Sequence, residues 1–283
     1  MNARLFRNFS FFSATLSFFL LVGIFVVLFI YSKEAIYTFG IEFLGNENWE
    51  VGEDDEGGIF GGFIPIIGTL YATLIAMVVA TPIAIGIAIF LTEVAPKFLI
   101  KPISISIELL AAIPSIIYGM WGLFYFAPIV SNFFGGTGMG LLTAGLVLAI
   151  MIIPFMSAIS KDAMNTTPDV LKESAYAMGA TKFEVVKDVV MPYAKSGIIG
   201  SIILALGRAL GETMAVAFLI GSVLQVPSKI TDPTTSIPVL LANNFAEAED
   251  LEMSSMFFLA LILFIVSFII ISVAKFFFIG RKS

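Results

Sequence analysis

The sequence predicts an all-α integral membrane protein with about six transmembrane helices. Hydrophobic residues make up 59% of the 283 residues, the mean hydropathy is +1.02, and only 13% of the residues are charged. Soluble domains carry about 25% charged residues, so a water-soluble fold of this size could not bury this much apolar surface. The apolar residues also fall into runs of roughly 20 residues or more, the length that a helix needs to cross the hydrocarbon core.

Six runs meet this length requirement, and they define the expected helices in chain order. The second run contains Pro65 and Pro82, and the third contains Pro114 and Pro128. Proline removes a backbone donor and clashes with the preceding turn, so we expect these two helices to bend or end there. The expected spans cover residues 9–31, 63–91, 103–130, 141–159, 197–224 and 256–279.

The distribution of charge predicts that both termini are cytoplasmic. Of the 15 Lys and Arg residues, only Lys33 and Lys229 fall in the segments that this topology places outside. The cytoplasmic side of a membrane protein collects positive charge, which sets the orientation. Acidic residues crowd the first and last outer loops, at Glu34, Glu42, Glu47, Glu50, Glu53, Asp54, Asp55, Glu56, Asp232, Glu247, Glu249, Asp250 and Glu252.

The first span is expected to remain as a membrane anchor. Arg4 and Arg7 resemble the basic start of a signal peptide, but the apolar run is too long and no A-x-A cleavage site follows it. We therefore divide the chain into an anchor with its acidic outer loop, residues 1–62, and a core, residues 63–283. The acidic, Gly-rich stretch 45–62 is either a solvated loop or a docking surface for an extracytoplasmic partner.

The residue types that are missing exclude several kinds of chemistry. The chain contains no Cys and no His, which excludes disulfides, Cys or His metal sites and imidazole acid–base catalysis. It contains no G-x-x-x-x-G-K-[ST] loop to hold ATP phosphates and no basic, aromatic surface for nucleic acid. We therefore expect a non-catalytic chain with no metal and no cofactor of its own.

The segment 161–195 is too long to be a simple turn between two cytoplasmic helix ends. Thr167-Pro168-Asp169 predicts a helix start with a threonine cap, and Gly179 is placed to end this helix in a left-handed conformation. Thr181-Lys-Phe-Glu184 is a capping box that begins a second short helix, which Pro192 is expected to end. Such a helix pair suits either docking into a groove of another protein or an amphipathic position on the membrane surface.

These residues also resemble a known motif. Glu173-Ser174-Ala175, then Gly179, then Val189-Val190-Met191-Pro192 match the spacing of the EAA loop of ABC importer permeases, with Ser, Val and Met as modest departures. The resemblance implies that Glu173, Ser174, Ala175, Gly179 and Pro192 belong to a coupling helix that contacts a cytoplasmic ATPase subunit.

Three ionisable residues within the predicted spans attract attention: Glu108, Arg208 and Glu212. A charge at mid-bilayer costs at least ~2.5–3.5 kcal/mol, so each must face protein or water. Arg208 and Glu212 are four residues apart and are expected to share a helical face with Ser201, Ala205, Gly211, Ala215 and Ser222. We interpret Arg208 as a contact for an oxyanion, with a structural ion pair as the alternative.

The third span is expected to repeat this design. Ser104, Glu108, Ala112, Ser115, Gly119 and Gly122 recur at helical spacing and would form a second slim, polar face. Two such faces are what a pathway between helices requires. Glu108 and Ser115 are therefore added to Arg208 and Glu212 as candidate pathway residues. Glu108 is the weaker candidate, because it is expected to lie near the membrane interface.

The same two regions carry a second resemblance. Residues 207–216, GRALGETMAV, resemble the fifth span of permeases of the high-affinity phosphate importer, and residues 108–122 are more similar to its PstC-type subunit than to the PstA type. The resemblance implies a type I ABC importer permease fold in the inner membrane. It also implies a PstA-type second permease, a PstB-type ATPase that binds ATP and Mg²⁺, and a PstS-type phosphate-binding protein outside.

Two other functions remain open from the sequence. An importer of another oxyanion, molybdate or sulfate, would share the loop and the topology. A membrane scaffold for phosphate sensing would need the partners but would move no solute. A proton-coupled carrier is disfavoured, because we detect neither an internal repeat nor a second site for a coupling ion.

Overall fold

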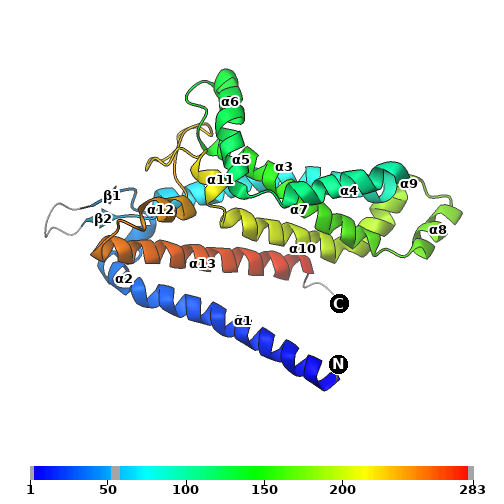
Figure 1. Cartoon of the computed structure of the whole chain (residues 1–283), viewed down its shortest axis with the longest axis horizontal. Helices are drawn as coiled ribbons and strands as arrows, with labels where there is room; N and C mark the ends of the chain where they lie inside the picture. Colours follow the sequence, from blue (N-terminus) through cyan, green and yellow to red (C-terminus); the bar gives the residue numbers. More distant parts are fainter. Residues whose placement is uncertain (1–2, 52–57, 280–283) are drawn as a thin grey trace. The chain divides into compact units, whose positions relative to one another are not determined.

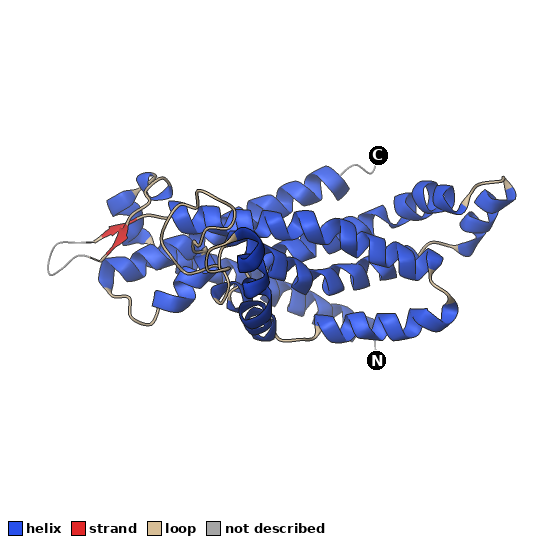
Figure 2. Cartoon of the chain, turned by 90° about the horizontal axis from the view of Figure 1, so that it is seen from above, coloured by secondary structure: helices blue, strands red, loops and turns tan. Residues whose placement is uncertain are grey.

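The computed structural model describes residues 3–51 and 58–279, and nearly all of its regular structure is helical (Figure 2). The chain forms two compact units. Unit 1 comprises Met1–Phe63 and Leu241–Val266, and unit 2 comprises Ile64–Leu240 and Ser267–Ser283. The division expected from the sequence, at residues 62 and 63, remains a prediction. Among the expected charged residues, Glu53, Asp54, Asp55, Glu56, Arg281 and Lys282 lie outside the described residues.

Unit 1 is held together by contacts between the end of its first helix and the start of its last. The hydroxyl of Ser254 donates to the Tyr31 carbonyl (2.9 Å) and accepts from the Ala35 amide (3.0 Å). The Phe43 ring packs on Phe258 at 4.6 Å between centroids. The elements of this unit are α1 (Ala3–Tyr31), α2 (Lys33–Phe39), η1 (Glu42–Leu44), β1 (Trp49–Glu50), β2 (Ile59–Phe60), part of α12 (Ile237–Asn244) and much of α13 (Asp250–Ile279).

The expected outer loop between the first two spans contains a short hairpin. Strands β1 and β2 pair antiparallel, with Trp49 opposite Phe60. The Trp49 ring packs edge-on against Phe60, and its Nε1 donates to a carboxylate oxygen of Glu252 at 3.2 Å. These contacts lie within unit 1, so this part of the loop is folded rather than only solvated.

Unit 2 contains the central part of the chain, and its helices pack around two apolar clusters. Figure 1 shows α4, α7 and α10 side by side, with α6 projecting across their direction. The elements are α3 (Phe63–Ile89), η2 (Phe90–Val94), α4 (Lys97–Ala111), α5 (Ser115–Trp121), η3 (Gly122–Phe126), α6 (Ala127–Phe134), α7 (Leu141–Asn165), α8 (Asp169–Ala177), α9 (Lys182–Glu184), η4 (Val185–Val190), α10 (Met191–Leu210) and α11 (Met214–Ala217).

Small residues let α3 approach its neighbours closely. Five alanines spaced four apart are buried along one face: Ala72, Ala76, Ala80, Ala84 and Ala88. Residues four apart lie on the same side of a helix, and small side chains there permit tight packing. The helix continues past Pro82, so this proline does not end it. The core that packs on this face includes Leu148, Met151 and Ile152 of α7.

Gly68 is the position on α3 where the approach is closest. A Cβ atom there would overlap the backbone carbonyl of Thr235, whereas a Cβ at Gly86 on the same helix would meet nothing within 4 Å. We expect Gly68→Ala to destabilise the fold by roughly 2–4 kcal/mol, because a backbone atom cannot move aside as a side chain can. Gly86→Ala is the matched control and should be neutral or slightly stabilising.

Thermal unfolding of the two variants in detergent measures the difference. A Gly68→Ala protein that unfolds at the same temperature as Gly86→Ala would contradict the packing of Thr235 on α3.

The third expected span is not a single helix. Helix α4 ends at Ala111 and α5 begins at Ser115, with Pro114 at its N-cap position. Proline disfavours helical conformation in the preceding residue, which explains the break. The prediction of one helix over residues 103–130 was therefore wrong, while the expected effect of Pro114 is confirmed. The membrane-length helix of this region covers Ser115–Phe134 instead.

The fifth expected span is also interrupted. Helix α10 ends at Leu210, Gly211 follows it, and the chain resumes as the short helix α11 at Met214. At its N-terminal end the helix extends further than expected, because it runs continuously from Lys182 to Leu210. Pro192 lies in its interior, as the second residue of α10 after the π-helical turn η4. The expectation that Pro192 ends a helix was wrong, since a π-helical turn accommodates the missing donor.

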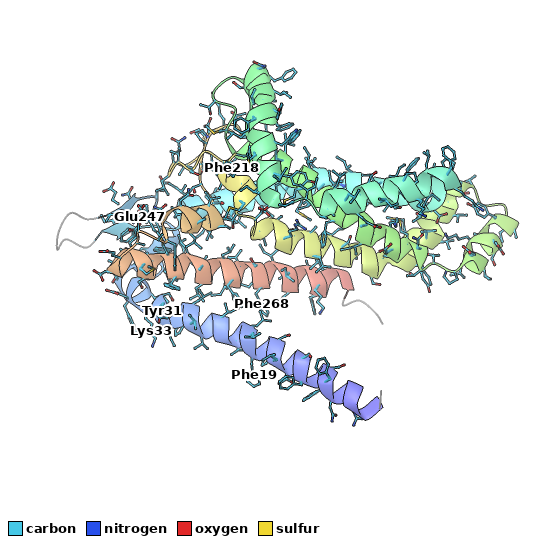
Figure 3. All side chains as sticks on the ribbon, in the orientation of Figure 1. Phe19, Tyr31, Lys33, Phe218, Glu247 and Phe268 are labelled. Atoms are coloured by element: carbon cyan, nitrogen blue, oxygen red, sulfur yellow. The ribbon has the colours of Figure 1, made fainter. Side chains whose placement is uncertain are left out.

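Six helices in the described part of the chain are long and apolar enough to cross a membrane. They are Arg7–Tyr31, Phe63–Val94, Ser115–Phe134, Leu141–Asn165, Lys182–Leu210 and Asp250–Phe276. Exposed aromatic side chains, such as Phe19 on α1 in Figure 3, suit contact with lipid rather than water. The expected number of spans is confirmed, and the cytoplasmic location of both termini remains a prediction.

Candidate functional site

The break after α10 releases Glu212 from the helix. Its carboxylate accepts a hydrogen bond from the Ala215 amide at 3.1 Å and so caps the start of α11. Helix N-termini carry unpaired amides and a partial positive charge, which favour a carboxylate. Arg208 stays on α10, and no salt bridge within 4.0 Å joins it to Glu212 among the described residues. The shared helical face expected from the sequence was therefore wrong, and the alternative of a structural ion pair between Arg208 and Glu212 does not form among the described residues.

Arg208 is half-buried and has an aromatic neighbour. Its guanidinium carbon lies 5.6 Å from the centre of the Phe155 ring on α7. A cation over an aromatic face gains a modest attraction while its donors stay available. No carboxylate of the described residues neutralises this guanidinium through a salt bridge. Arg208 therefore retains the charge and the hydrogen-bond donors that binding of an oxyanion requires.

A small cavity lies beside Glu212. Its volume is about 10 Å³, close to the space that one water needs, and its polar lining comes from Thr69 and Thr73 of α3, from Ser236 and from Glu212. Ser236 is only 3% exposed, and its hydroxyl has no hydrogen-bond partner among the described residues. The structure thus brings buried polar groups together next to a carboxylate, at a point too narrow for an oxyanion in this conformation.

The sequence reasoning missed three residues of this cavity. Thr69 and Thr73 are four apart in the second span, and this spacing of polar residues could have identified them. Ser236 follows an irregular loop, where no periodic pattern is available. Only the folded chain brings it to α3, where Thr69 Oγ1 accepts a hydrogen bond from the Ile237 amide at 2.9 Å.

The second polar face expected from the sequence does not form. Because the helix breaks between Ala111 and Ser115, Glu108 on α4 and Ser115 on α5 belong to different helices. Glu108 is exposed, Ser115 is half-buried, and the structure shows no hydrogen bond from either to Arg208 or Glu212. Gly119 and Gly122 serve packing instead, because added Cβ atoms would press on Phe218 and Leu219.

The expected stripe on α10 is likewise a packing face. Ser201 and Ala205 are completely buried, and the Ser201 hydroxyl lies 2.7 Å from that of Ser160 on α7. Gly207 allows close contact with Ile271, whose Cδ1 would lie 3.3 Å from an added Cβ. These residues fix α10 to its neighbours. Of the candidate pathway residues, Arg208 and Glu212 with their surroundings therefore remain.

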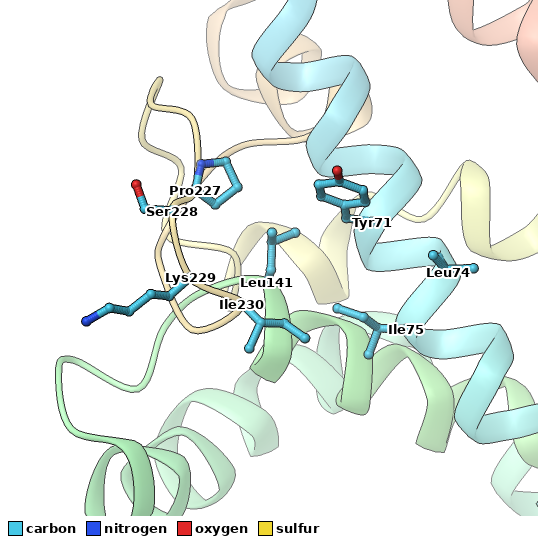
Figure 4. A pocket seen from close by; sticks show the side chains of 8 residues that line it. All are labelled: Tyr71, Leu74, Ile75, Leu141, Pro227, Ser228, Lys229 and Ile230. Atoms are coloured by element: carbon cyan, nitrogen blue, oxygen red, sulfur yellow. The ribbon is translucent and has the colours of Figure 1, made fainter.

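A larger cavity in unit 2 is unsuited to an anion. It has a volume of about 330 Å³ and is lined by Tyr71, Leu74, Ile75, Leu141, Pro227, Ser228, Lys229 and Ile230. Figure 4 shows the Lys229 side chain pointing away from these residues. The backbone amides of Ser228 and Lys229 donate to the Asp232 carboxylate at 3.1 and 2.8 Å. The cavity is thus an apolar hollow under a loop that these hydrogen bonds hold together.

The segment 161–195 forms a helix, a glycine turn and a second helix start. The capping box is confirmed: the Glu184 amide donates to Thr181 Oγ1, and the Glu184 carboxylate accepts from the Thr181 amide at 2.7 Å. Gly179 adopts φ = +91°, a conformation that favours glycine. The threonine cap was wrong, because α8 begins after Pro168 and the buried Thr167 hydroxyl has no partner among the described residues.

The motif residues of this segment divide into an exposed and a buried group. Glu173, Ser174, Gly179 and Pro192 are exposed, whereas Ala175 is 7% exposed and packs with Ala88, Met164, Val185 and Val190. Large apolar side chains also remain exposed here, with Val170 at 69%, Met178 at 85% and Phe183 at 71%. Ala175 therefore anchors α8 to its own chain, and the other residues form a surface that suits a protein partner.

The fold is that of type I ABC importer permeases. The structure resembles a permease chain of a bacterial alginate ABC transporter solved with an alginate-bound periplasmic protein (TM-score 0.65, 16% identity, 96% of this chain and 93% of that chain). It also resembles a chain of the MetNI methionine ABC transporter in an inward-facing conformation (TM-score 0.62, 20% identity, 77% and 95%). At these identities the similarity shows the fold, and it confirms the expected fold class.

A family model described as "Binding-protein-dependent transport system inner membrane component" matches residues 80–279. The chain belongs to this family. It is 45% identical to the phosphate transport system permease protein PstC of Pasteurella multocida, over 96% of this chain and 90% of the relative. It is 46% identical to PstC of Haemophilus influenzae, over 93% and 88%.

Together with the six apolar helices, the family places the chain in the inner membrane as a multi-pass subunit. Family members are transport permeases that act with a substrate-binding protein and an ATPase. The expected localisation and class are confirmed.

Proposed function

We propose that this chain is the PstC-type permease of an ATP-driven phosphate importer. The observation that carries the substrate assignment is the identity of 45–46% to several PstC proteins over nearly the whole chain. The half-buried Arg208 guanidinium supports it, because no carboxylate of the described residues forms a salt bridge with it and Arg offers planar donors to an oxyanion at every physiological pH. Arg208 would contact the anion, and Glu212 would shape the passage beside it.

The mechanism proposed is alternating access. Closure of the ATPase subunits would move the surface formed by Glu173, Ser174 and Gly179, and this motion would shift the helices of unit 2. The cavity at Glu212 would then widen from its present size of about 10 Å³ to admit the anion. Weak binding suffices along such a path, because tight binding would trap the solute.

The partners proposed are those of a PstC protein. A PstA-type permease would complete the translocation pathway, a PstB-type ATPase would bind ATP and Mg²⁺, and a PstS-type protein would deliver phosphate outside. The chain itself would bind no nucleotide and no metal. The exposed apolar residues Val170, Met178 and Phe183 support a protein partner at the cytoplasmic loop.

Radiolabelled phosphate uptake into vesicles that contain the full complex tests this proposal. We expect ATP-dependent uptake that unlabelled phosphate suppresses and that molybdate and sulfate leave largely unchanged. Preferential uptake of molybdate or sulfate would show that this anion, and not phosphate, is the substrate. A complex that moves no solute, while deletion of the chain alters phosphate-dependent signalling, would favour the scaffold function.

A further inference from the structure

A largely shielded, part-buried ion pair joins the predicted coupling helix α8 to the end of α3. Lys172 Nζ donates to the Glu93 carboxylate at 2.6 Å, and the two side chains are only 17% and 8% exposed. Glu93 lies in the π-helical turn η2 that ends α3, and Lys172 directly precedes Glu173 of the EAA-like motif. Charges so nearly removed from water interact much more strongly than surface pairs, and the loss of one partner leaves the other uncompensated.

Apolar contacts close the same junction on both sides of the ion pair. Ala175 of α8 and Ala88 of α3 belong to one buried cluster with Met164 at the end of α7. The neighbouring Thr92 hydroxyl donates to the Ala88 carbonyl at 3.0 Å. The exposed helix α8 therefore packs chiefly on η4 and shares a buried apolar cluster with the end of α3.

The other end of α3 reaches the candidate pathway. Thr69 and Thr73 of α3 line the small cavity beside Glu212. The helix is unbroken from Phe63 to Ile89, so a displacement at one end is carried along its length to the other. One continuous helix thus connects the Lys172–Glu93 pair with the polar groups next to Glu212.

We propose that Lys172 and Glu93 are positioning residues that transmit movement of α8 to α3, and through α3 to the cavity at Glu212. The pair adds a directional, charge-assisted hydrogen bond to the apolar contacts at this junction, and so it strengthens the attachment of α8 to the end of α3. This inference rests on the proposed function, in which an ATPase moves α8. It assigns the connection to one pair of side chains and to one transmembrane helix.

The test compares three variants in the reconstituted complex. Lys172→Met and Glu93→Gln each break the pair, and the double variant Lys172→Glu with Glu93→Lys exchanges the charges. Lys187→Met removes a positive charge from an exposed position of the same cytoplasmic segment and serves as the control. The readouts are complex assembly, ATP hydrolysis stimulated by the binding protein, and phosphate transported per ATP hydrolysed.

We expect both single variants to assemble and to lose about tenfold in phosphate transported per ATP, since coupling between sites is typically of this size. The exchanged pair should recover most of the loss, and Lys187→Met should match the native complex. Single variants that keep the native ratio would overturn the proposal, as would a loss explained by failed assembly that the exchanged pair does not recover.

This outcome is separable from failure of the proposed function. If the native complex transported no phosphate, the assignment of phosphate as the substrate would be wrong. The stimulated ATP hydrolysis would still report whether the pair transmits movement, because the single variants should weaken the stimulation and the exchanged pair should recover it.

Discussion

Replacement of Arg208 by Ala is expected to reduce phosphate uptake by the reconstituted complex about 10- to 100-fold. The guanidinium lies over Phe155 and has no carboxylate within salt-bridge distance among the described residues, so its donors are free for the anion. A hydrogen bond to a charged group contributes about 1.5–3 kcal/mol, which corresponds to this range of rates. Initial rates of radiolabelled phosphate uptake, normalised to assembled complex, measure the effect.

Two further variants separate an anion contact from a structural role. Arg208→Met keeps much of the packing volume but removes the charge, and it should lose nearly as much uptake as Arg208→Ala. Arg208→Lys keeps the charge without the planar donors and should fall between native and Met. Lys195→Ala removes a charge from an exposed position of the same helix α10 and should transport normally. Full uptake by Arg208→Ala at normal assembly would remove the anion role.

Replacement of Gly179 by Val should uncouple the ATPase from the permease. Gly179 has φ = +91°, and a β-branched residue pays roughly 1–3 kcal/mol to hold this conformation. A Cβ at this position would meet nothing within 4 Å in the chain. The cost of the substitution is therefore backbone strain and not a steric clash. We expect the distorted turn to displace α8 and to lower binding-protein-stimulated ATP hydrolysis about tenfold or more.

A companion variant tells strain from contact with the partner. Asn adopts positive φ far more readily than Val, so Gly179→Asn should retain most of the stimulation unless the partner closely approaches this position. Gly200→Ala, at an open position of α10 with ordinary helical φ, should be silent. Normal coupling by Gly179→Val would discard the assignment of this turn to ATPase docking.

Local chemistry made the cytoplasmic loop predictable from the sequence. The capping box of Thr181 and Glu184 depends on residues three apart, and the positive φ of Gly179 depends on one residue with no Cβ. Thr167 shows the limit of this reasoning. Its hydroxyl was expected to cap the helix start, but it is buried and has no hydrogen-bond partner among the described residues.

The misassigned helices have one cause. Residues 103–130 and 197–224 are apolar enough to read as continuous spans, and hydropathy does not register where the backbone hydrogen bonds stop. The break before Ser115 was signalled by Pro114, whereas the break at Gly211 depends on Glu212 capping the Ala215 amide. Reading Arg208 and Glu212 as neighbours on one helix therefore failed, although both residues were correctly singled out as charges within an apolar segment.

The amino-acid sequence by itself determined the membrane class, the six spans in outline and the local turns of the cytoplasmic loop. These depend on composition and on residues a few positions apart. Only the tertiary structure decided which groups share a site: Ser236 with Thr69 and Thr73, and Lys172 with Glu93. Lys172 and Glu93 are 79 residues apart in the chain, and the hydrogen bond from Ile237, the neighbour of Ser236, to Thr69 spans 168 residues. Their proximity follows from how helices pack on one another, which no local pattern encodes.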